Sequence, residues 1–270
     1  MPQYALMIPA TDQFPPPGHV TVNGDYEMPI RSLAFIACVS LAVAGCQSDK
    51  SITGTAPPTA LVRFINATNT GMDAAINGLV TTANTNIASL GATQCLTVGV
   101  ATPGLTVRNT GTTADLTGLT PTFVAGHEYW VVAITGAGGA TEFVQLDQAF
   151  TPTAPATDNG IAGLNANFGG GPYDLHVAVP GTALSTATVK VGNLAFGVPS
   201  ALVNNTIPFN TATPPVAQPL QLQFTGAGNT TVARNHGNVT MVPSTSGLAI
   251  VVSGTAATPA TLRSIFNAGC

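Results

Sequence analysis

The apolar positions of this chain recur in short stretches, and several of these stretches alternate with polar positions. Alternation is clear over residues 105–108, 174–179 and 220–225, where every second residue is apolar. A period of two residues is typical of a strand that buries one face. The pattern therefore predicts β-strands at these three places.

Three other stretches, 61–65, 129–134 and 248–252, are almost continuously apolar. Short runs of this kind, rich in Val, Ile and aromatic residues, predict strands that are buried on both faces. Gly, Asn and Pro separate the predicted strands at roughly ten-residue intervals, and no apolar helical repeat of useful length is present. This spacing is typical of all-β sandwiches.

The two halves of the chain resemble each other in sequence. Three pairs of segments match, with an offset of about 100 to 118 residues: 123–136 with 241–254, 104–108 with 219–223, and 61–78 with 161–181. An offset of this size indicates a tandem duplication rather than a solenoid. We therefore predict two tandem Ig-like β-sandwich modules, at residues 60–150 and 160–270. The Thr- and Pro-rich segment 151–159 is either a linker or a long surface loop.

A different pattern occupies the beginning of the chain. Residues 32–44 are apolar or small, follow Arg31, and end in the sequence Val43-Ala44-Gly45-Cys46. The run is shorter than the ~20 residues that a membrane-spanning helix needs, and it fits the apolar core of a secretory signal. A cysteine after small residues at this point is typical of a bacterial lipobox.

The lipobox predicts a lipoprotein signal peptide over residues 28–45, cleavage before Cys46, and diacylation of the Cys46 thiol. Cys38 is a competing acylation site, but the apolar run before it is very short. Residues 46–59 would then form a polar tether. Two acyl chains would hold the protein stably on a membrane, because each buried methylene adds ~0.8 kcal/mol.

Residues 1–27 do not fit the front of a secretory signal, because they carry Asp12, Asp25, Glu27 and a run of three prolines. We expect translation to start at Met28, which would make residues 1–27 a mis-assigned N-terminal extension.

Composition supports strands and excludes one class of partner. Charged residues make up 7% of the chain, against an ordinary ~25%. Thr, Val, Gly and Asn are abundant, whereas helix-forming Lys, Glu and Met are scarce. The net charge is −4 and there is no basic patch. We therefore expect no nucleic-acid partner.

Two cysteines, Cys95 and Cys270, remain after processing and lipidation. Export to an oxidising compartment makes a disulfide between them one expectation, and two unpaired thiols are the alternative. Sequence alone does not show whether the two sulfur atoms meet.

Three short motifs carry a family resemblance. They are Leu61-Val62-Arg63-Phe64-Ile65-Asn66-Ala67, Asp73-Ala74-Ala75-Ile76-Asn77-Gly78, and Ala125-Gly126 before Tyr129-Trp130-Val131-Val132-Ala133. Over roughly residues 60–179 the chain resembles the bacterial domain-of-unknown-function 4397 family. The second half departs from the pattern, since the position matching Arg63 is apolar or Gly near Gly163. The resemblance implies export or lipid anchoring and repeated β-rich modules, and it implies no activity and no catalytic residues.

Glycines 136, 138 and 139 follow a strong strand and invite comparison with a dinucleotide-binding loop. Such a loop needs a helix directly after it, whose N-terminus would face the pyrophosphate. Here the strand-like segment 141–146 follows, and a hairpin turn is the better interpretation.

No other catalytic or metal-binding pattern is present. His127, His176 and His236 lack the spacing of metal ligands, and we expect them to be solvated surface residues. There is no Gly-x-Ser-x-Gly motif. Asp73 and Asp174 occupy similar places in the two halves, where we expect each carboxylate to close a turn. The sequence therefore predicts no catalytic residue, no metal and no cofactor.

These observations predict a non-enzymatic lipoprotein of the bacterial envelope with a structural or interaction role. Gln47, rather than Asp, follows Cys46, which favours the outer membrane; the protein would face the periplasm or the cell exterior. The alternative is a module that binds an envelope protein or a polysaccharide, with Trp130 and Tyr173 as stacking faces, although Trp130 lies in a run expected to be core. An enzyme is the third hypothesis.

Overall fold

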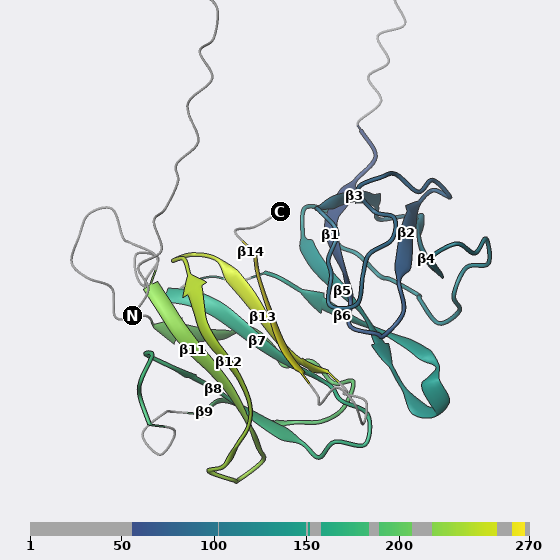
Figure 1. Cartoon of the computed structure of the whole chain (residues 1–270). Helices are drawn as coiled ribbons and strands as arrows, with labels where there is room; N and C mark the ends of the chain where they lie inside the picture. Colours follow the sequence, from purple (N-terminus) through teal and green to yellow (C-terminus); the bar gives the residue numbers. More distant parts are fainter. Residues whose placement is uncertain are drawn as a thin grey trace, which may run out of the picture. The chain divides into compact units, whose positions relative to one another are not determined.

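The computed structural model describes residues 56–101, 103–149, 151, 158–183, 189–206, 218–252 and 261–267, without the side chains of 218, 232–238 and 261–267. Within these residues the chain is all-β, as predicted, and the one helical element is a three-residue 3-10 turn at Ala137–Gly139 (Figure 1). The predicted extension 1–27, signal peptide 28–45 and most of the tether 46–59 lie outside the described residues.

The first half of the chain, residues 59–149, forms two sheets. Its strands are β1 (Thr59–Asn66), β2 (Met72–Ile76), β3 (Leu96–Gly99), β4 (Leu105–Asn109), β5 (Glu128–Thr135) and β6 (Thr141–Asp147). Four strands make a sheet in the order β3-β1-β5-β6, and β2 pairs with β4 in a second sheet. The central strands β1 and β5 are parallel, and the other neighbours are antiparallel.

The second half, residues 158–267, repeats this plan with two additional strands. Its strands are β7 (Asp158–Ala166), β8 (Tyr173–Ala178), β9 (Val189–Leu194), β10 (Val203–Thr206), β11 (Gln218–Gly226), β12 (Val232–Met241), β13 (Ser246–Val252) and β14 (Thr261–Asn267). One sheet has the order β10-β7-β13-β14 with β7 and β13 parallel, and the other has the order β12-β11-β8-β9. Each half therefore has a four-stranded sheet with a central parallel pair between antiparallel edges.

Each half has its own core between its two sheets. In the first half, β1 and β5 direct Val62, Phe64 and Val131 toward β2 and β4, which supply Met72 and Val107. The corresponding core of the second half is formed by buried side chains of β7, β8, β11 and β13. Because alternate residues of a strand point to opposite faces, this core accounts for only one face of each central sheet.

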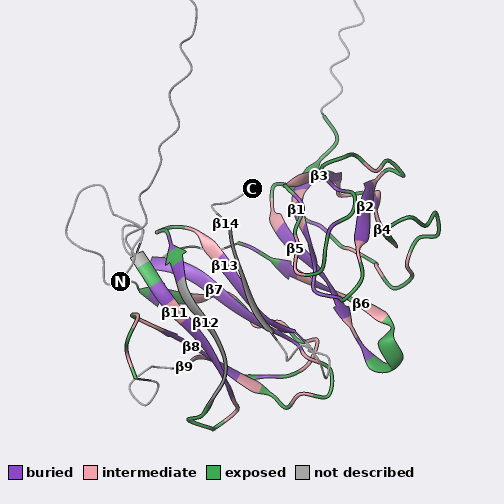
Figure 2. Cartoon of the chain, viewed as in Figure 1, coloured by how far each residue is buried: buried purple, intermediate pink, exposed green. Residues whose placement is uncertain are grey.

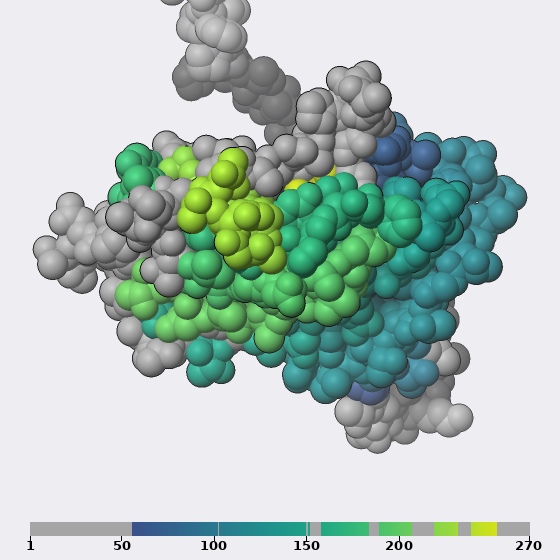
Figure 3. Space-filling view, turned by 90° about the horizontal axis from the view of Figure 1, so that it is seen from below, coloured from purple at the N-terminus to yellow at the C-terminus, as the bar shows by residue number. Residues whose placement is uncertain are grey.

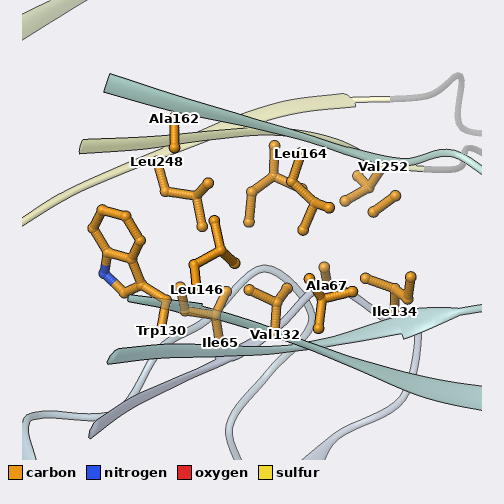
Figure 4. Close-up of a cluster of buried hydrophobic side chains, with 13 residues drawn as sticks. Ile65, Ala67, Trp130, Val132, Ile134, Leu146, Ala162, Leu164, Leu248 and Val252 are labelled. Atoms are coloured by element: carbon orange, nitrogen blue, oxygen red, sulfur yellow. The ribbon is translucent and has the colours of Figure 1, made fainter. Parts of the chain in front are cut away.

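The second face of each central sheet is buried against the other half (Figure 4). One cluster of buried apolar side chains contains Ile65, Ala67, Trp130, Val132, Ile134, Val144 and Leu146 of the first half, and Ala162, Leu164, Ala166, Leu248, Ile250 and Val252 of the second. We call this the shared core. It explains why 61–65, 129–134 and 248–252 are apolar at nearly every position, and Figure 2 shows these strands as buried.

Equivalent positions of the two halves enter the shared core. Trp130 and Leu248 are the third residues of β5 and β13, and Ile65 and Leu164 are the seventh residues of β1 and β7. The two central sheets thus use the same face to pack on each other, and residues 56–270 form one compact unit. The immunoglobulin-like character of the two predicted modules stays a prediction.

Candidate functional site

A small polar site lies where β5 begins and β6 ends, beside the start of β1. The Thr59 carbonyl accepts a hydrogen bond from the Gly126 N–H (2.9 Å), and the Leu61 N–H donates to the carbonyl of His127 (3.0 Å). His127 Nδ1 and Asp147 Oδ2 are 2.7 Å apart, and each side chain is 40% exposed. The tether therefore enters the fold next to this histidine–carboxylate pair.

A hollow of about 360 Å³ adjoins the pair and is lined by Gly126, His127, Glu128, Gln148 and Ala149. The imidazole also lies stacked near the Tyr129 ring, with centroids 6.2 Å apart. A carboxylate on one ring nitrogen can orient an imidazole. No group of three or more metal-ligating side chains occurs among the described residues, and the sequence pattern did not predict this pair.

The expectation that His176 is solvated is wrong. Its side chain is only 6% exposed, and its Nε2 lies 3.2 Å from the Thr225 hydroxyl. The reason is topological, because β8 runs inside its sheet between β11 and β9, where the neighbouring Gln223 and Thr225 are also buried. His127 is half-exposed, and the side chain of His236 lies outside the described residues.

Asp73 and Asp174 organise equivalent turns, as expected. Asp73 Oδ1 accepts hydrogen bonds from the Asn86 N–H (2.7 Å) and from the hydroxyls of Thr85 and Thr110. Asp174 accepts the N–H groups of Asn193 (2.7 Å) and Gly228 (2.8 Å).

Two opposing effects act on the pKa of Asp73. Burial raises the pKa of this carboxyl, but hydrogen bonds from the Asn86 N–H, Thr110, Thr85 and the Gly111 N–H outweigh it, so the pKa lies below its ordinary value of 3.8. The carboxylate is therefore ionised at neutral pH and serves as a structural acceptor.

A pair of fully buried asparagines, which sequence reasoning missed, fixes the ends of β1 and β7. Asn66 Nδ2 donates to the carbonyls of Thr70 (2.7 Å) and Ile87 (2.8 Å), and Asn165 Nδ2 donates to those of Gly171 (3.3 Å) and Leu194 (3.2 Å). Each Oδ1 accepts an N–H two residues further along the chain. Asn66 and Asn165 are the eighth residues of β1 and β7. The sequence alignment of the two halves, which places Arg63 opposite Gly163, is one residue out of register with this pairing and so did not bring the two asparagines together.

Cys95 is disulfide-bonded, and the Arg63 Nη2 donates to its Sγ at 3.5 Å. The partner cysteine lies outside the described residues, so the predicted pairing of Cys95 with Cys270 stays a prediction. Burial lowers the pKa of the Arg63 guanidinium and the nearby Glu128 raises it, and the net effect is a lowered pKa. The predicted lipidation site, Cys46, also lies outside the described residues.

The two aromatic residues considered for ligand stacking have different surroundings in the structure. Trp130 has no exposed surface and belongs to the shared core, as its apolar neighbours indicated. Tyr173 is half-buried; its hydroxyl accepts a hydrogen bond from Asn167 (2.7 Å), and its ring meets Phe224 edge-on.

The glycine-rich segment after β5 is a hairpin turn to β6, as predicted, with Gly136 N–H donating to the Ala140 carbonyl.

No protein-family model and no curated protein matches this chain. Among the described residues, no helix is long and apolar enough to cross a bilayer.

Proposed function

We propose that this chain is a lipid-anchored lipoprotein of the bacterial outer membrane with a non-enzymatic structural or interaction role. The observation that carries this proposal is the sequence Val43-Ala44-Gly45-Cys46 at the end of a short apolar run. In this proposal Cys46 is the acylated residue, and the folded part faces the periplasm or the cell exterior. The resemblance to the domain-of-unknown-function 4397 family and the Ig-like tandem modules belong to the same proposal.

The distance from Cys46 to the first strand supports an anchored, membrane-proximal fold. The described chain begins at Ala56 and β1 begins at Thr59. The 13 residue steps from Cys46 to Thr59 can span at most about 45 Å when fully extended, at ~3.5 Å per residue. An acylated Cys46 would therefore hold the start of β1, and the His127–Asp147 pair beside it, within that distance of the lipid headgroups.

The uses of the buried polar residues support a structural or interaction role. Four buried polar side chains hydrogen-bond to backbone groups or hydroxyls of neighbouring turns: those of Asp73, Asp174, Asn66 and Asn165. The repeated strand order of the two halves supports the tandem modules.

Metabolic labelling tests the anchor. Cells that produce the full chain are grown with an alkyne analogue of palmitate, and the label on the purified protein is compared for the unaltered chain, Cys46→Ser and Cys38→Ser. We expect label on the unaltered chain and on Cys38→Ser, and none on Cys46→Ser, which would also leave the membrane fraction.

Label that persists in Cys46→Ser and disappears in Cys38→Ser would move the anchor to the competing site. An unaltered chain that takes up no label would overturn the proposal.

A further inference from the structure

The chain enters the fold beside a turn that leads into β5. The Thr59 carbonyl accepts the N–H of Gly126 (2.9 Å), and the Leu61 N–H donates to the carbonyl of His127 (3.0 Å). Residues 56–59, which precede the buried part of β1, are exposed. The tether therefore meets the folded part next to this turn.

The second half has the same turn at the start of β13. The Asp158 carbonyl accepts the N–H of Ser244 (2.8 Å), and the Gly160 N–H donates to the carbonyl of Thr245 (2.9 Å). These are the two hydrogen bonds of the first turn, made by the first and third residues of β7 in place of those of β1. The two turns are therefore equivalent residue for residue.

An exposed valine occupies the same place in both turns. Val124 and Val242 are 53% and 45% exposed, respectively. Each follows a buried residue of its own half's core, Phe123 or Met241. An exposed apolar side chain gains no burial energy in the folded monomer. Both valines are therefore available for a contact outside the folded chain.

Both turns lie at one end of the central strands. The Ser246 hydroxyl, at the start of β13, donates to the carbonyl of Gln148 (3.3 Å), whose N–H donates to the carbonyl of Glu128 at the start of β5. Figure 4 shows Trp130 and Leu248, the third residues of β5 and β13, at the same end of the shared core. We call this end the tether end, and it comprises residues 56–59, 124–127 and 242–245.

The place where the tether enters favours a lipid surface as the partner of this end. An acylated Cys46 lies at most about 45 Å from Thr59 along an extended chain, and the tether joins the fold at this end. A short tether gives the fold a high effective concentration at the bilayer surface, so weak contacts suffice to orient it. Apolar side chains on a protein surface make such contacts by entering the boundary between headgroups and acyl chains.

The charges at the tether end favour a bilayer of zwitterionic lipids. Its residues and the adjoining positions 128 and 147–149 contain two carboxylates, Glu128 and Asp147, and no Lys or Arg. Residues 46–55 add one Asp and one Lys, which cancel. Because anionic lipid surfaces attract clusters of Lys and Arg, an end that carries carboxylates is better suited to lipids without net charge.

We propose that the tether end is a membrane-contact face, where Val124 and Val242 enter the headgroup region of a zwitterionic bilayer. Two contacts, one in each half, hold the fold with its other end away from the lipid. The inference rests on the proposed function for the anchor that brings the tether to the bilayer.

The test uses the full chain, purified in its acylated form and reconstituted into phosphatidylcholine vesicles. A fluorescent amino acid replaces Val124, Val242 or, as the matched control, Val198. Val198 is also exposed (58%), but it lies at the other end of the central strands, where the Gly197 N–H donates to the carbonyl of Asn165 near the end of β7. Figure 3 views the molecule from below, the side toward which β7 runs in Figure 1.

Phosphatidylcholine with a nitroxide on its headgroup quenches a fluorophore that lies at headgroup depth. We expect quenching at positions 124 and 242 to be at least about threefold stronger than at position 198, because only the first two positions enter the headgroup region. Replacing part of the phosphatidylcholine with phosphatidylglycerol should weaken the quenching at both positions.

Substitution of the two valines tests their contribution. With the fluorophore at position 125, Val124→Asp together with Val242→Asp should lower the quenching to the level of position 198, and Val198→Asp should leave it unchanged. Circular dichroism verifies that these variants are folded. If the double aspartate variant is unfolded, Val124→Ser with Val242→Ser repeats the measurement.

Three outcomes would overturn the inference: equal quenching at positions 124, 242 and 198, quenching that the double substitution does not reduce, or quenching that increases with phosphatidylglycerol. If any of these occurs in an acylated chain, the contact face is wrong and the anchor stands.

A second anchor separates the contact face from acylation. Residues 47–270 with six histidines ahead of them are held on phosphatidylcholine vesicles that contain a nickel-chelating lipid. If the natural chain takes up no acyl label but this chain still shows stronger quenching at positions 124 and 242 than at 198, only the lipid anchor is wrong.

Discussion

The residues that determine the local conformation of this chain are polar ones inside a charge-poor protein. Asn66 and Asn165 have no exposed surface, and each amide satisfies carbonyl groups that the end of a strand would otherwise leave unpaired. From the similar places of Asp73 and Asp174 in the two halves, the sequence predicted that each carboxylate closes a turn. It did not reveal the asparagines, because an Asn in an apolar stretch looks the same whether it caps a loop or faces water.

At this scale we predict that Asn66→Ala and Asn165→Ala each lower the free energy of unfolding by about 1–3 kcal/mol, the cost of leaving buried carbonyls without a donor. Urea unfolding measures the loss. The matched control is Asn69→Ala, an exposed asparagine in the loop that Asn66 holds, for which we expect a change within about 0.5 kcal/mol. Equal effects at positions 66 and 69 would contradict the assigned role.

The depressed pKa of Asp73 predicts a pH-dependent contribution to stability. In the folded protein its pKa lies below 3.8, so the carboxylate stabilises the fold above that pH, and the contribution is lost as pH falls through the folded pKa. We therefore expect Asp73→Asn to destabilise the protein at pH 7 and to approach the stability of the unaltered chain as pH falls through the lowered pKa of Asp73. Unfolding midpoints recorded from pH 7 to pH 2 give the comparison, and a constant difference across this range would exclude the mechanism.

At the scale of strands and turns, the local pattern of apolar and polar residues predicted the buried strands, but it did not predict most of the edge strands. β1, β5 and β13 were visible as continuous apolar runs, and β4, β8 and β11 as alternations. The sequence pattern did not predict β3 and β10, because they are edge strands of only four residues. It did not predict β12, because the sequence of this strand is largely polar. Their conformation comes from pairing with a neighbour, which no local window of sequence contains. The parallel pairing of β1 with β5 is non-local in the same way.

Positive φ at two glycines defines the tight turn between β5 and β6. Gly138 and Gly139 have φ values of +66° and +82°. We expect Gly139→Ala to lower stability by about 1 kcal/mol, because a Cβ is strained in this region. Gly171→Ala is the control, since its backbone is ordinary and an added Cβ meets no atom within 4 Å. Thermal unfolding that shifts as much for position 171 as for 139 would contradict this explanation.

At the scale of the whole molecule, the sequence indicated the duplication but not its consequence for packing. The apolar run at 129–134 predicted a strand buried on both faces, but it did not show that the other half supplies the second partner. That contact depends on which faces of the two central sheets meet, and many residues separate them along the chain. The shared core makes the two halves one packed body instead of two independent modules.

The single tryptophan of the chain, Trp130, reports on the shared core from the first half. We predict that Leu222→Ala, which creates a cavity in the separate core of the second half, lowers stability by about 2–5 kcal/mol. Because the halves share apolar contacts, the Trp130 emission transition should shift together with the far-UV circular dichroism transition. Leu79→Ala, at a side chain 72% exposed, should move neither. A Trp130 transition that stays in place while part of the dichroism signal melts earlier would show that the halves unfold separately.

The shared core also sets the smallest piece of this chain that can be handled in solution. An expression clone that ends before residue 158 would place seven apolar side chains, from Ile65 to Leu146, in water at once, and the product should precipitate or self-associate. A clone that starts at Ala56 and continues past β14 keeps every described contributor to that interior, and is the one to choose for crystallisation or NMR.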